Sequence, residues 1–212
     1  FIQGASAVVA GGVILGANAP VARSAFVSGS DEIKIGLIGC GGRGRGAAIQ
    51  ALKSGGKVTL WSLADAFIDR VQESLAEITA TIEDQKRDND KIKDATIDVP
   101  VDRQFVGFDA YQKVIDSGVD VVVMATTPGF RPIHFEAAVK AGKHIFAEKP
   151  IAVDAPGVRR FLAANEEAKK KGLKVGIGLQ RHHQPPYLEA IKRLKDGAIG
   201  DIMYTRVYWN GT

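Results

Sequence analysis

Short apolar segments alternate with helical segments between residues 33 and 179, and this alternation constrains the fold more than any other feature of the sequence. The segment 119–126 (VDVVVMAT) is the strongest example, because its valines continue without the polar alternation of a half-exposed strand. Such a strand is buried on both faces, as in a parallel sheet that helices cover. The sequence therefore predicts an α/β fold with an open, doubly wound parallel sheet and right-handed crossovers.

The elements of this sheet follow from apolar periodicity and from turn residues. The predicted strands are 33–39, 57–65, 103–106, 119–126, 144–149 and 174–179. The predicted helices are 45–53, one whose apolar face runs from Phe67 to Ile82, one that Asp109 caps, 132–141, and about 155–171 with Asp154 at its start. The segment 83–98 is dense in charges of both signs, so we expect an exposed excursion there and not a core element.

The chain changes character after the last predicted strand. Tyr187, Ile191 and Leu194 form one more helix face, and residues 200–210 (GDIMYTRVYWN) alternate as a new strand. A single strand is not stable without partners, and no partner strand comes after it in the sequence. We therefore expect residues 31–184 to form one domain and residues 185–212 to be the start of an incomplete second domain.

The first thirty residues differ in composition from the rest. Residues 5–20 (ASAVVAGGVILGANAP) are apolar, small and uncharged, and they are too few and too rich in glycine for a membrane span. They are similar to the hydrophobic region of an export signal, with residues 17–19 (ANA) as the cleavage site, and FIQGASA resembles the residues after the arginine pair of a twin-arginine signal. We expect residues 1–30 to direct export to the periplasm. The alternative is an N-terminal arm that packs on a neighbouring subunit of a cytoplasmic protein.

Charge and cysteine content argue against several classes of protein. The chain has 28 Lys and Arg residues against 24 Asp and Glu residues, a net charge of +4, and its basic residues are scattered. We therefore expect no nucleic-acid partner. Cys40 is the only cysteine, which excludes an internal disulfide. The four histidines lack metal-ligand spacing, and we predict no metal site.

The segment GCGGRG (39–44) has the G-x-G-x-x-G spacing of a phosphate-binding loop. The spacing alone is weak evidence, but here it comes after a predicted strand and opens a predicted helix, whose N-terminal amides favour a pyrophosphate. The alternative is a plain turn. The predicted cofactor contacts in the loop are Gly39, Cys40, Gly41, Gly42, Arg43 and Gly44. At Cys40 we expect the backbone to matter more than the thiol, and Arg43 either contacts phosphate or is solvated.

Asp65 ends the second predicted strand, where an acidic residue binds the adenosine ribose in dinucleotide-binding folds. Its charge would repel a 2′-phosphate, and no arginine comes next at Ala66 or Phe67. We therefore predict NAD as the cofactor. Arg70, one helical turn further on, leaves NADP open as an alternative.

Two more strands end in residues that suit a cofactor cleft, because doubly wound sheets bind ligands at the carboxyl ends of their strands. Thr126, Thr127 and Pro128 lie at the end of the fourth predicted strand or just beyond it and are expected to line the cofactor. His134 lies in the next helical turn, and we place it at the site, with a surface or capping role as the alternative.

Glu148 and Lys149 lie at the end of the fifth predicted strand and point to opposite sides of it. An ammonium group at Lys149 can hydrogen-bond a substrate hydroxyl or carbonyl and help to move its proton. The alternative for Lys149 is an exposed side chain in a loop.

The loop 39–44, Asp65, TTPGFRPIHFEAAVKAGKHIFAEKP (126–150) and GLQRHHQP (178–185) together resemble the Gfo/Idh/MocA family, which includes glucose–fructose oxidoreductase and inositol dehydrogenase. The resemblance covers about residues 31–212 and is most specific at AGKHIFAEKP (141–150). It implies a Rossmann domain followed by an α+β domain with an open, largely antiparallel sheet. Because the family commonly assembles through that sheet, the resemblance also implies a homo-oligomer.

The resemblance implies roles for individual residues. Lys149 matches the family's lysine that contacts the substrate hydroxyl and assists proton transfer, and Glu148 matches the glutamate near the nicotinamide. His134 matches the histidine in the loop after the fourth strand. The bond between Lys149 and Pro150 is expected to be cis. The family's further catalytic residues lie in the second domain.

Motif and resemblance together predict an NAD-dependent oxidoreductase that transfers a hydride between nicotinamide and a secondary alcohol or carbonyl of a sugar or polyol. Lys149 is its expected catalytic residue, and Arg181 and His182 are expected to line the substrate cleft, unless the histidines are merely buried or exposed. Two alternatives remain open: an NAD-dependent glycosidase of the same superfamily, and a non-catalytic NAD-binding protein.

Overall fold

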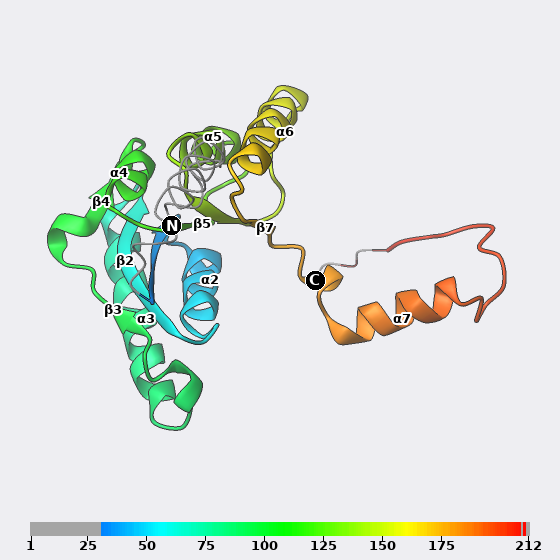
Figure 1. Cartoon of the computed structure of the whole chain (residues 1–212), viewed down its shortest axis with the longest axis horizontal. Coiled ribbons are helices and arrows are strands. Elements are labelled where there is room, and N and C mark those ends of the chain that lie inside the picture. The colour runs from blue at the N-terminus through cyan, green and yellow to red at the C-terminus, as the bar shows by residue number, and fades with distance from the viewer. Residues whose placement is uncertain (1–30, 209, 211–212) are drawn as a thin grey trace, which may run out of the picture. The chain divides into compact units, whose positions relative to one another are not determined.

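A computed structural model describes residues 31–208 and residue 210 (Figure 1). The predicted export signal or N-terminal arm, residues 1–30, lies outside the described residues. The chain divides into two compact units, with the boundary between Ile177 and Gly178. The domain boundary expected at 184/185 stays a prediction. No helix among the described residues is long and apolar enough to cross a bilayer.

The first unit is built on one parallel sheet of seven strands, which confirms the predicted doubly wound fold. The strands are β1 (Glu32–Ile38), β2 (Lys57–Asp65), β3 (Thr96–Ile97), β4 (Gln104–Val106), β5 (Val121–Met124), β6 (His144–Ala147) and β7 (Val175–Ile177). Their order is β3-β2-β1-β5-β6-β7, and β4 also pairs with β2. The chain thus builds outward from β1 in one direction and then, starting with β5, in the other, so the strand order reverses between β1 and β5.

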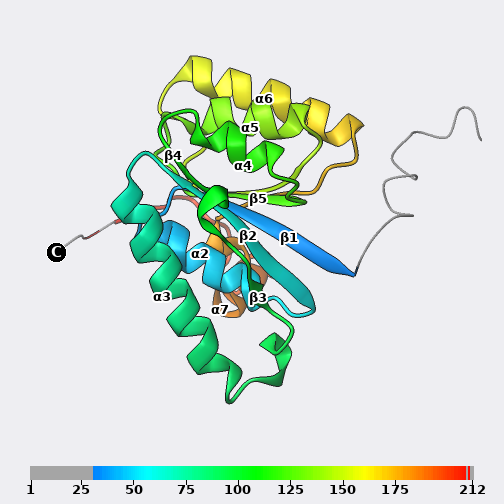
Figure 2. The same cartoon turned by 90° about the vertical axis from the view of Figure 1, so that its left-hand side faces the viewer.

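Helices cover both faces of this sheet. Figures 1 and 2 show α2 (Gly42–Leu52) and α3 (Ile68–Lys86) on one face. The other face carries α4 (Ala110–Asp116), α5 (Arg131–Lys140) and α6 (Ala155–Lys170). Each face has its own apolar core, and the neighbouring residues Leu37 and Ile38 of β1 belong to opposite cores. Alternate strand residues point to opposite faces, so the continuous apolar runs fill both cores at once.

The segment 83–98 is not the exposed excursion that its charges predict. α3 continues to Lys86, and a 3₁₀ turn, η2 (Asp90–Ile92), leads to β3, which pairs with β2. Ile92 and Ala95 are fully buried in the core beside α2 and α3. Two apolar side chains among many charges suffice to anchor the segment, because only the inward-facing positions have to be apolar.

The starts of several helices differ from the sequence-based expectation. α2 begins at Gly42, three residues before the predicted start, so the second half of the glycine loop (residues 39–44) belongs to the helix. Phe67 is not on the buried face of α3 but precedes the helix with its ring exposed. Asp154 caps α6 as predicted, since its carboxylate accepts from the Gly157 amide at 2.7 Å. Asp109 stands at the start of α4 without capping it and pairs with Lys113.

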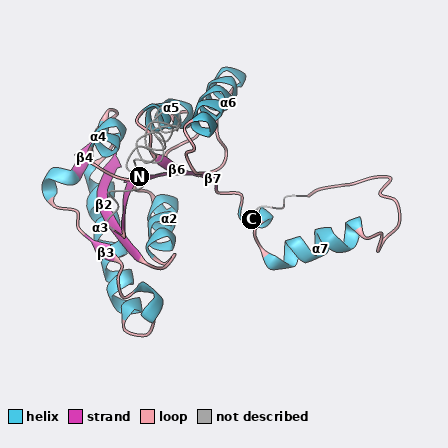
Figure 3. Ribbon diagram, viewed as in Figure 1, coloured by secondary structure: helices cyan, strands magenta, loops and turns pink. Residues whose placement is uncertain are grey.

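The second unit contains a 3₁₀ turn, η4 (Gln180–His182), and the predicted helix, here α7 (Pro185–Lys195) (Figure 3). Within this unit η4 contacts α7. The predicted strand at 200–210 is wrong for the described residues: 201–208 form no strand, and their large apolar side chains are exposed. An alternating segment becomes a strand only when another strand completes its hydrogen bonds, and the described residues provide none.

Candidate functional site

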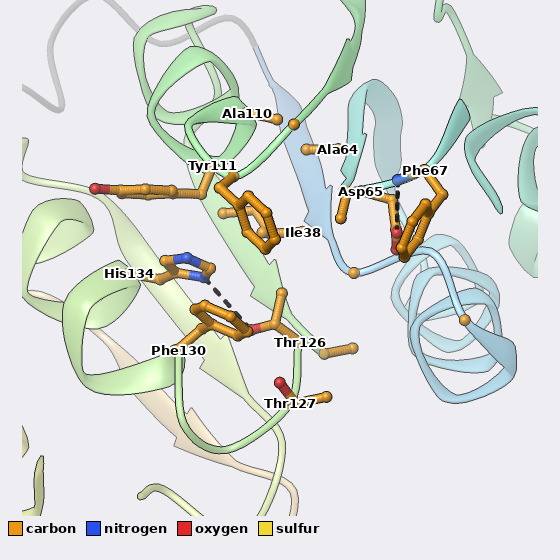
Figure 4. A pocket seen from close by; sticks show the side chains of 16 residues that line it. Ile38, Ala64, Asp65, Phe67, Ala110, Tyr111, Thr126, Thr127, Phe130 and His134 are labelled. Carbon is orange, nitrogen blue, oxygen red and sulfur yellow. Dashed lines mark hydrogen bonds between the residues drawn. The ribbon is translucent and has the colours of Figure 1, made fainter. Parts of the chain in front are cut away.

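A pocket of ≈ 340 Å³ lies at the carboxyl ends of β1, β2, β4 and β5, where the strand order reverses (Figure 4). In doubly wound sheets this is where ligands bind, and the volume is within the usual range for ligand pockets. Six predicted site residues line it: Gly39, Gly41, Asp65, Thr126, Thr127 and His134. Figure 4 shows Asp65 and Phe67 on one side of the hollow and Thr126, Phe130 and His134 on the other.

The three glycines of the loop meet three different steric demands. Gly39 has φ +95°, and a Cβ there would lie 2.6 Å from the Thr126 amide nitrogen. A Cβ at Gly44 would lie 1.8 Å from the Gly39 carbonyl oxygen, so only glycine lets α2 pack this closely on the turn after β1. A Cβ at Gly41 would meet nothing within 4 Å, which leaves open space for a phosphate against the backbone. The plain-turn alternative does not require this close packing.

The start of α2 can receive an anion. Gly41 precedes the helix with extended backbone, and no side chain caps it. The first amides of a helix have no partner within it, and together with the helix dipole they favour a negative charge. Among the described residues, no acidic residue occupies the first turn of α2. A pyrophosphate therefore suits this position.

Asp65 joins the glycine loop to the end of β2. One carboxylate oxygen accepts from the Cys40 amide at 2.7 Å. The other accepts from the Phe67 amide at 3.2 Å (Figure 4). A carboxylate offers about four acceptor positions. Asp65 therefore keeps acceptor capacity toward the pocket while its two amide bonds fix its orientation.

The Cys40 amide donates to Asp65, and the predicted contact of Cys40 with a cofactor stays a prediction. Its thiol is buried and donates to the Ala64 carbonyl at 3.4 Å. Burial, and then the charge of Asp65, raise the pKa of the Cys40 thiol, so it stays protonated. A thiol of this kind is unreactive.

Aromatic side chains form the far wall of the pocket, and the sequence motifs do not reveal them as a group. His134 stacks on Tyr111 with ring centroids 4.1 Å apart, and the Phe130 ring lies 6.1 Å from it. Phe67 and Phe108 also line the pocket with exposed rings. Phe108 lies directly beyond the carboxyl end of β4, so the strand-end rule applied to that strand was the signal that could have found it.

His134 is a neutral imidazole across the physiological range. Its Nδ1 lies 3.4 Å from the Thr126 hydroxyl oxygen, and its ring is largely buried between aromatic neighbours. Burial lowers the pKa of His134 to about 4. It is thus a pocket-lining group, and its ring is neither a surface residue nor a cap.

A second group of charged residues lies beyond the end of β6. The Arg43 guanidinium, on the first turn of α2, donates to the buried carboxylate of Glu148. Lys149 is exposed at the same carboxyl edge of the sheet, and its bond to Pro150 is cis, as expected. Arg131, which no sequence motif singled out, is buried and donates to the Pro150 carbonyl.

The remaining predicted residues lie away from this pocket's walls. Arg70 is exposed on α3, 3.9 Å from the Glu73 carboxylate. Gly42 is in the glycine loop and Pro128 is in the loop after β5, but neither residue lines the pocket. Arg181 and His182 lie in η4 of the second unit, so their assignment to a substrate cleft stays a prediction. Within the described part of the chain, no three His, Cys, Asp or Glu side chains gather as metal ligands.

The geometry of the glycine loop, the Asp65 carboxylate and the pocket fits a bound dinucleotide. The sequence also matches that of a known protein family. The pattern of the GFO_IDH_MocA family, an oxidoreductase family with an NAD-binding Rossmann fold, matches residues 33–179.

Two curated relatives are named as inositol dehydrogenases. An inositol 2-dehydrogenase/D-chiro-inositol 3-dehydrogenase from Lactiplantibacillus plantarum is 34% identical over 49% of this chain and 29% of its own length. An inositol 2-dehydrogenase from Acidothermus cellulolyticus is 29% identical over 80% of this chain and 42% of its own length. The match thus spans less than half the length of either relative.

A solved structure shares the fold. Apo scyllo-inositol dehydrogenase from Lactobacillus casei superimposes with a TM-score of 0.61 at 21% identity, over 81% of this chain and 43% of that chain.

Proposed function

The chain belongs to the Gfo/Idh/MocA family of oxidoreductases with an NAD-binding Rossmann fold, and we propose that the protein is an NAD-dependent dehydrogenase of a sugar or polyol. The observation that carries this proposal is that the glycine loop, Asp65 and Lys149 all lie at the carboxyl edge of one parallel sheet. The names of the two relatives, both inositol dehydrogenases, support a cyclic polyol as the substrate.

The residues that would hold the cofactor can be read from the site. The amides at the start of α2 would bind the pyrophosphate, and Asp65 would accept from the ribose hydroxyls. Its negative charge favours NAD over NADP. When bound, the nicotinamide supplies the hydride chemistry.

Lys149 would accept and donate the proton of the substrate hydroxyl. As an amine it accepts the proton while the alcohol becomes a carbonyl, and as an ammonium it donates to the carbonyl oxygen in the reverse direction. Its exposure leaves it accessible to a substrate that enters from solvent. The protein's contribution is therefore to orient the substrate and to provide one proton-transferring group.

The direct test measures NADH formation by the full-length protein with myo-inositol, scyllo-inositol and glucose. We expect turnover with NAD, and a fall in kcat of about 10²–10⁴-fold in Lys149→Ala, which is the usual size of a general acid–base contribution. The exposed Lys174, after α6, gives a matched control, and Lys174→Ala should keep the wild-type kcat. Equal kcat values in wild type and Lys149→Ala would refute the catalytic assignment.

The proposal extends to location and assembly. The apolar, uncharged composition of residues 5–20 supports export to the periplasm, and the family resemblance supports a homo-oligomer. Mass spectrometry of the mature protein from fractionated cells tests the first point. Cleavage after Ala19 in the periplasmic fraction would support it, and an intact N-terminus in the cytoplasm would contradict it.

A further inference from the structure

Arg131 occupies a position that ordinarily disfavours a cation. It is the first residue of α5, where the helix dipole repels positive charge, and it is 5% exposed. Burying a guanidinium is costly unless a carboxylate and hydrogen-bond acceptors compensate it. Arg131 is unfavourable both as a cation at a helix N-terminus and as a buried charge, and such a residue points to a functional requirement at its position.

Groups that offset part of this cost lie on both sides of Lys149 in the sequence. The Arg131 guanidinium donates to the carbonyl of Pro150, the residue after Lys149. The charge of Glu148, the residue before Lys149, also acts on it, since burial lowers the pKa of Arg131 while Glu148 raises it. Arg131 therefore interacts with both neighbours of Lys149, while the lysine side chain itself is exposed.

Glu148 and the loop beyond Pro150 are held from further directions. The Glu148 amide donates to the Met124 carbonyl at 2.9 Å, and its carboxylate accepts from Arg43. A Cβ on Gly157 would lie 3.2 Å from the Pro132 side chain, so the start of α6 lies close to the first turn of α5. The Arg131 guanidinium adds a side-chain hydrogen bond to the carbonyl of Pro150, the residue directly after Lys149.

We propose that Arg131 is a positioning residue that fixes residues 148–150 so that the Lys149 amine meets the substrate hydroxyl. This inference rests on the proposed function. Misplacing a reacting group by about 1 Å costs about 10²-fold in rate, so the effect of Arg131 should appear in kcat. The Arg131 guanidinium donates to Pro150, and its link to the glycine loop runs only through the charge of Glu148 and the Glu148–Arg43 pair, so the affinity for NAD should change far less than kcat.

The kinetic test compares Arg131→Gln, Arg131→Lys and Arg131→Ala in the full-length protein, with myo-inositol and scyllo-inositol as substrates. In Arg131→Gln we expect kcat to fall about 10²-fold while the NAD Kd stays within about twofold. Arg131→Lys keeps the charge and one donor and should recover part of kcat. Added methylguanidine should partly restore Arg131→Ala, because it can replace the missing group. Arg159→Gln, an exposed arginine on α6, is the matched control and should keep the wild-type kcat.

A second measurement does not require turnover. Hydrogen–deuterium exchange should be faster at residues 148–154 in Arg131→Gln than in wild type, with no change at β2. If Arg131→Gln unfolds, Arg131→Lys, which keeps the positive charge and changes the hydrogen bond to Pro150, carries the same comparison.

The outcomes are distinct. Wild-type protein that turns over no polyol defeats the proposed function, and the exchange measurement then decides the positioning role alone. A wild-type kcat in Arg131→Gln, or unchanged exchange at 148–154, overturns the positioning role. A parallel loss of NAD binding, thermal stability and kcat also overturns it, because it would show Arg131 to be a general structural residue.

Discussion

At Gly44 a single methyl group decides whether the cofactor loop can keep its shape. A Cβ there would lie 1.8 Å from the Gly39 carbonyl oxygen, which is backbone and cannot move aside without distorting the turn after β1. We predict that Gly44→Ala abolishes NAD binding and lowers the free energy of unfolding by about 1–3 kcal/mol, as overpacking does. Calorimetric titration and denaturant unfolding measure the two effects.

Gly46 provides the control for this prediction, because it lies one half-turn along the same helix in open space. A Cβ there would meet only the Arg43 guanidinium, at 4.0 Å. Gly46→Ala should therefore keep NAD binding and stabilise the protein by about 0.5–1 kcal/mol through helix propensity. If Gly44→Ala and Gly46→Ala had the same NAD affinity and the same free energy of unfolding, the close packing at Gly44 would not explain why the loop needs glycine there.

His134 should make stability depend on pH in a defined window. Because its pKa is lowered from 6.5 to about 4 in the folded protein, the unfolded chain binds a proton between these values that the folded chain does not. Its contribution is thus fully present above pH 6.5 and is lost as the pH falls toward 4.

The measurement is the free energy of unfolding against pH for wild type and His134→Phe, whose ring can still stack on Tyr111. The difference between the two proteins should change across this window, with wild type losing more stability on acidification. Parallel curves for the two proteins would contradict a buried, neutral His134.

At the scale of elements, two aspartates that look equivalent in the sequence differ in the structure. Asp154 accepts from the Gly157 amide, whereas Asp109 makes no cap and pairs with Lys113 on the surface. We predict that Asp154→Ala lowers the free energy of unfolding by about 1 kcal/mol. Asp109→Ala should leave the free energy of unfolding close to the wild-type value, because the ion pair it removes is exposed to solvent.

Asp154→Asn serves as the conservative variant, since its amide oxygen can still accept the Gly157 hydrogen bond. Chemical denaturation of the three variants checks these values. A larger loss in Asp109→Ala than in Asp154→Ala would show that the capping geometry does not govern these helix starts.

Elements with continuous apolar runs could be predicted closely, because burial on both faces leaves a strong pattern. β2 has its predicted bounds, 57–65, and β5 lies within the predicted 119–126. The missed β3 has two residues and is recognisable only from its pairing with β2. The wrongly predicted strand at 200–210 has the pattern of a strand but no pairing partner among the described residues.

Across the whole molecule, the site residues in the glycine loop and at the strand ends could be predicted from the sequence, whereas Arg131 and Tyr111 could not. Gly39 and Gly44 belong to one loop, and Asp65 ends the next strand at the spacing typical of dinucleotide-binding folds, so their meeting at one edge is predictable. Arg131 and Tyr111 reach the site from different helices. Their roles depend on how α4 and α5 pack over the sheet, and no local sequence pattern predicts that packing.

We propose that this chain binds NAD through the glycine loop and Asp65. The most direct measurement is calorimetric titration of the full-length protein with NAD and with NADP, repeated with Asp65→Asn. We predict that wild type binds NAD more tightly than NADP, and that Asp65→Asn, which lacks the negative charge, narrows this difference. Absence of NAD binding, or tighter binding of NADP by the wild-type protein, would contradict the claim.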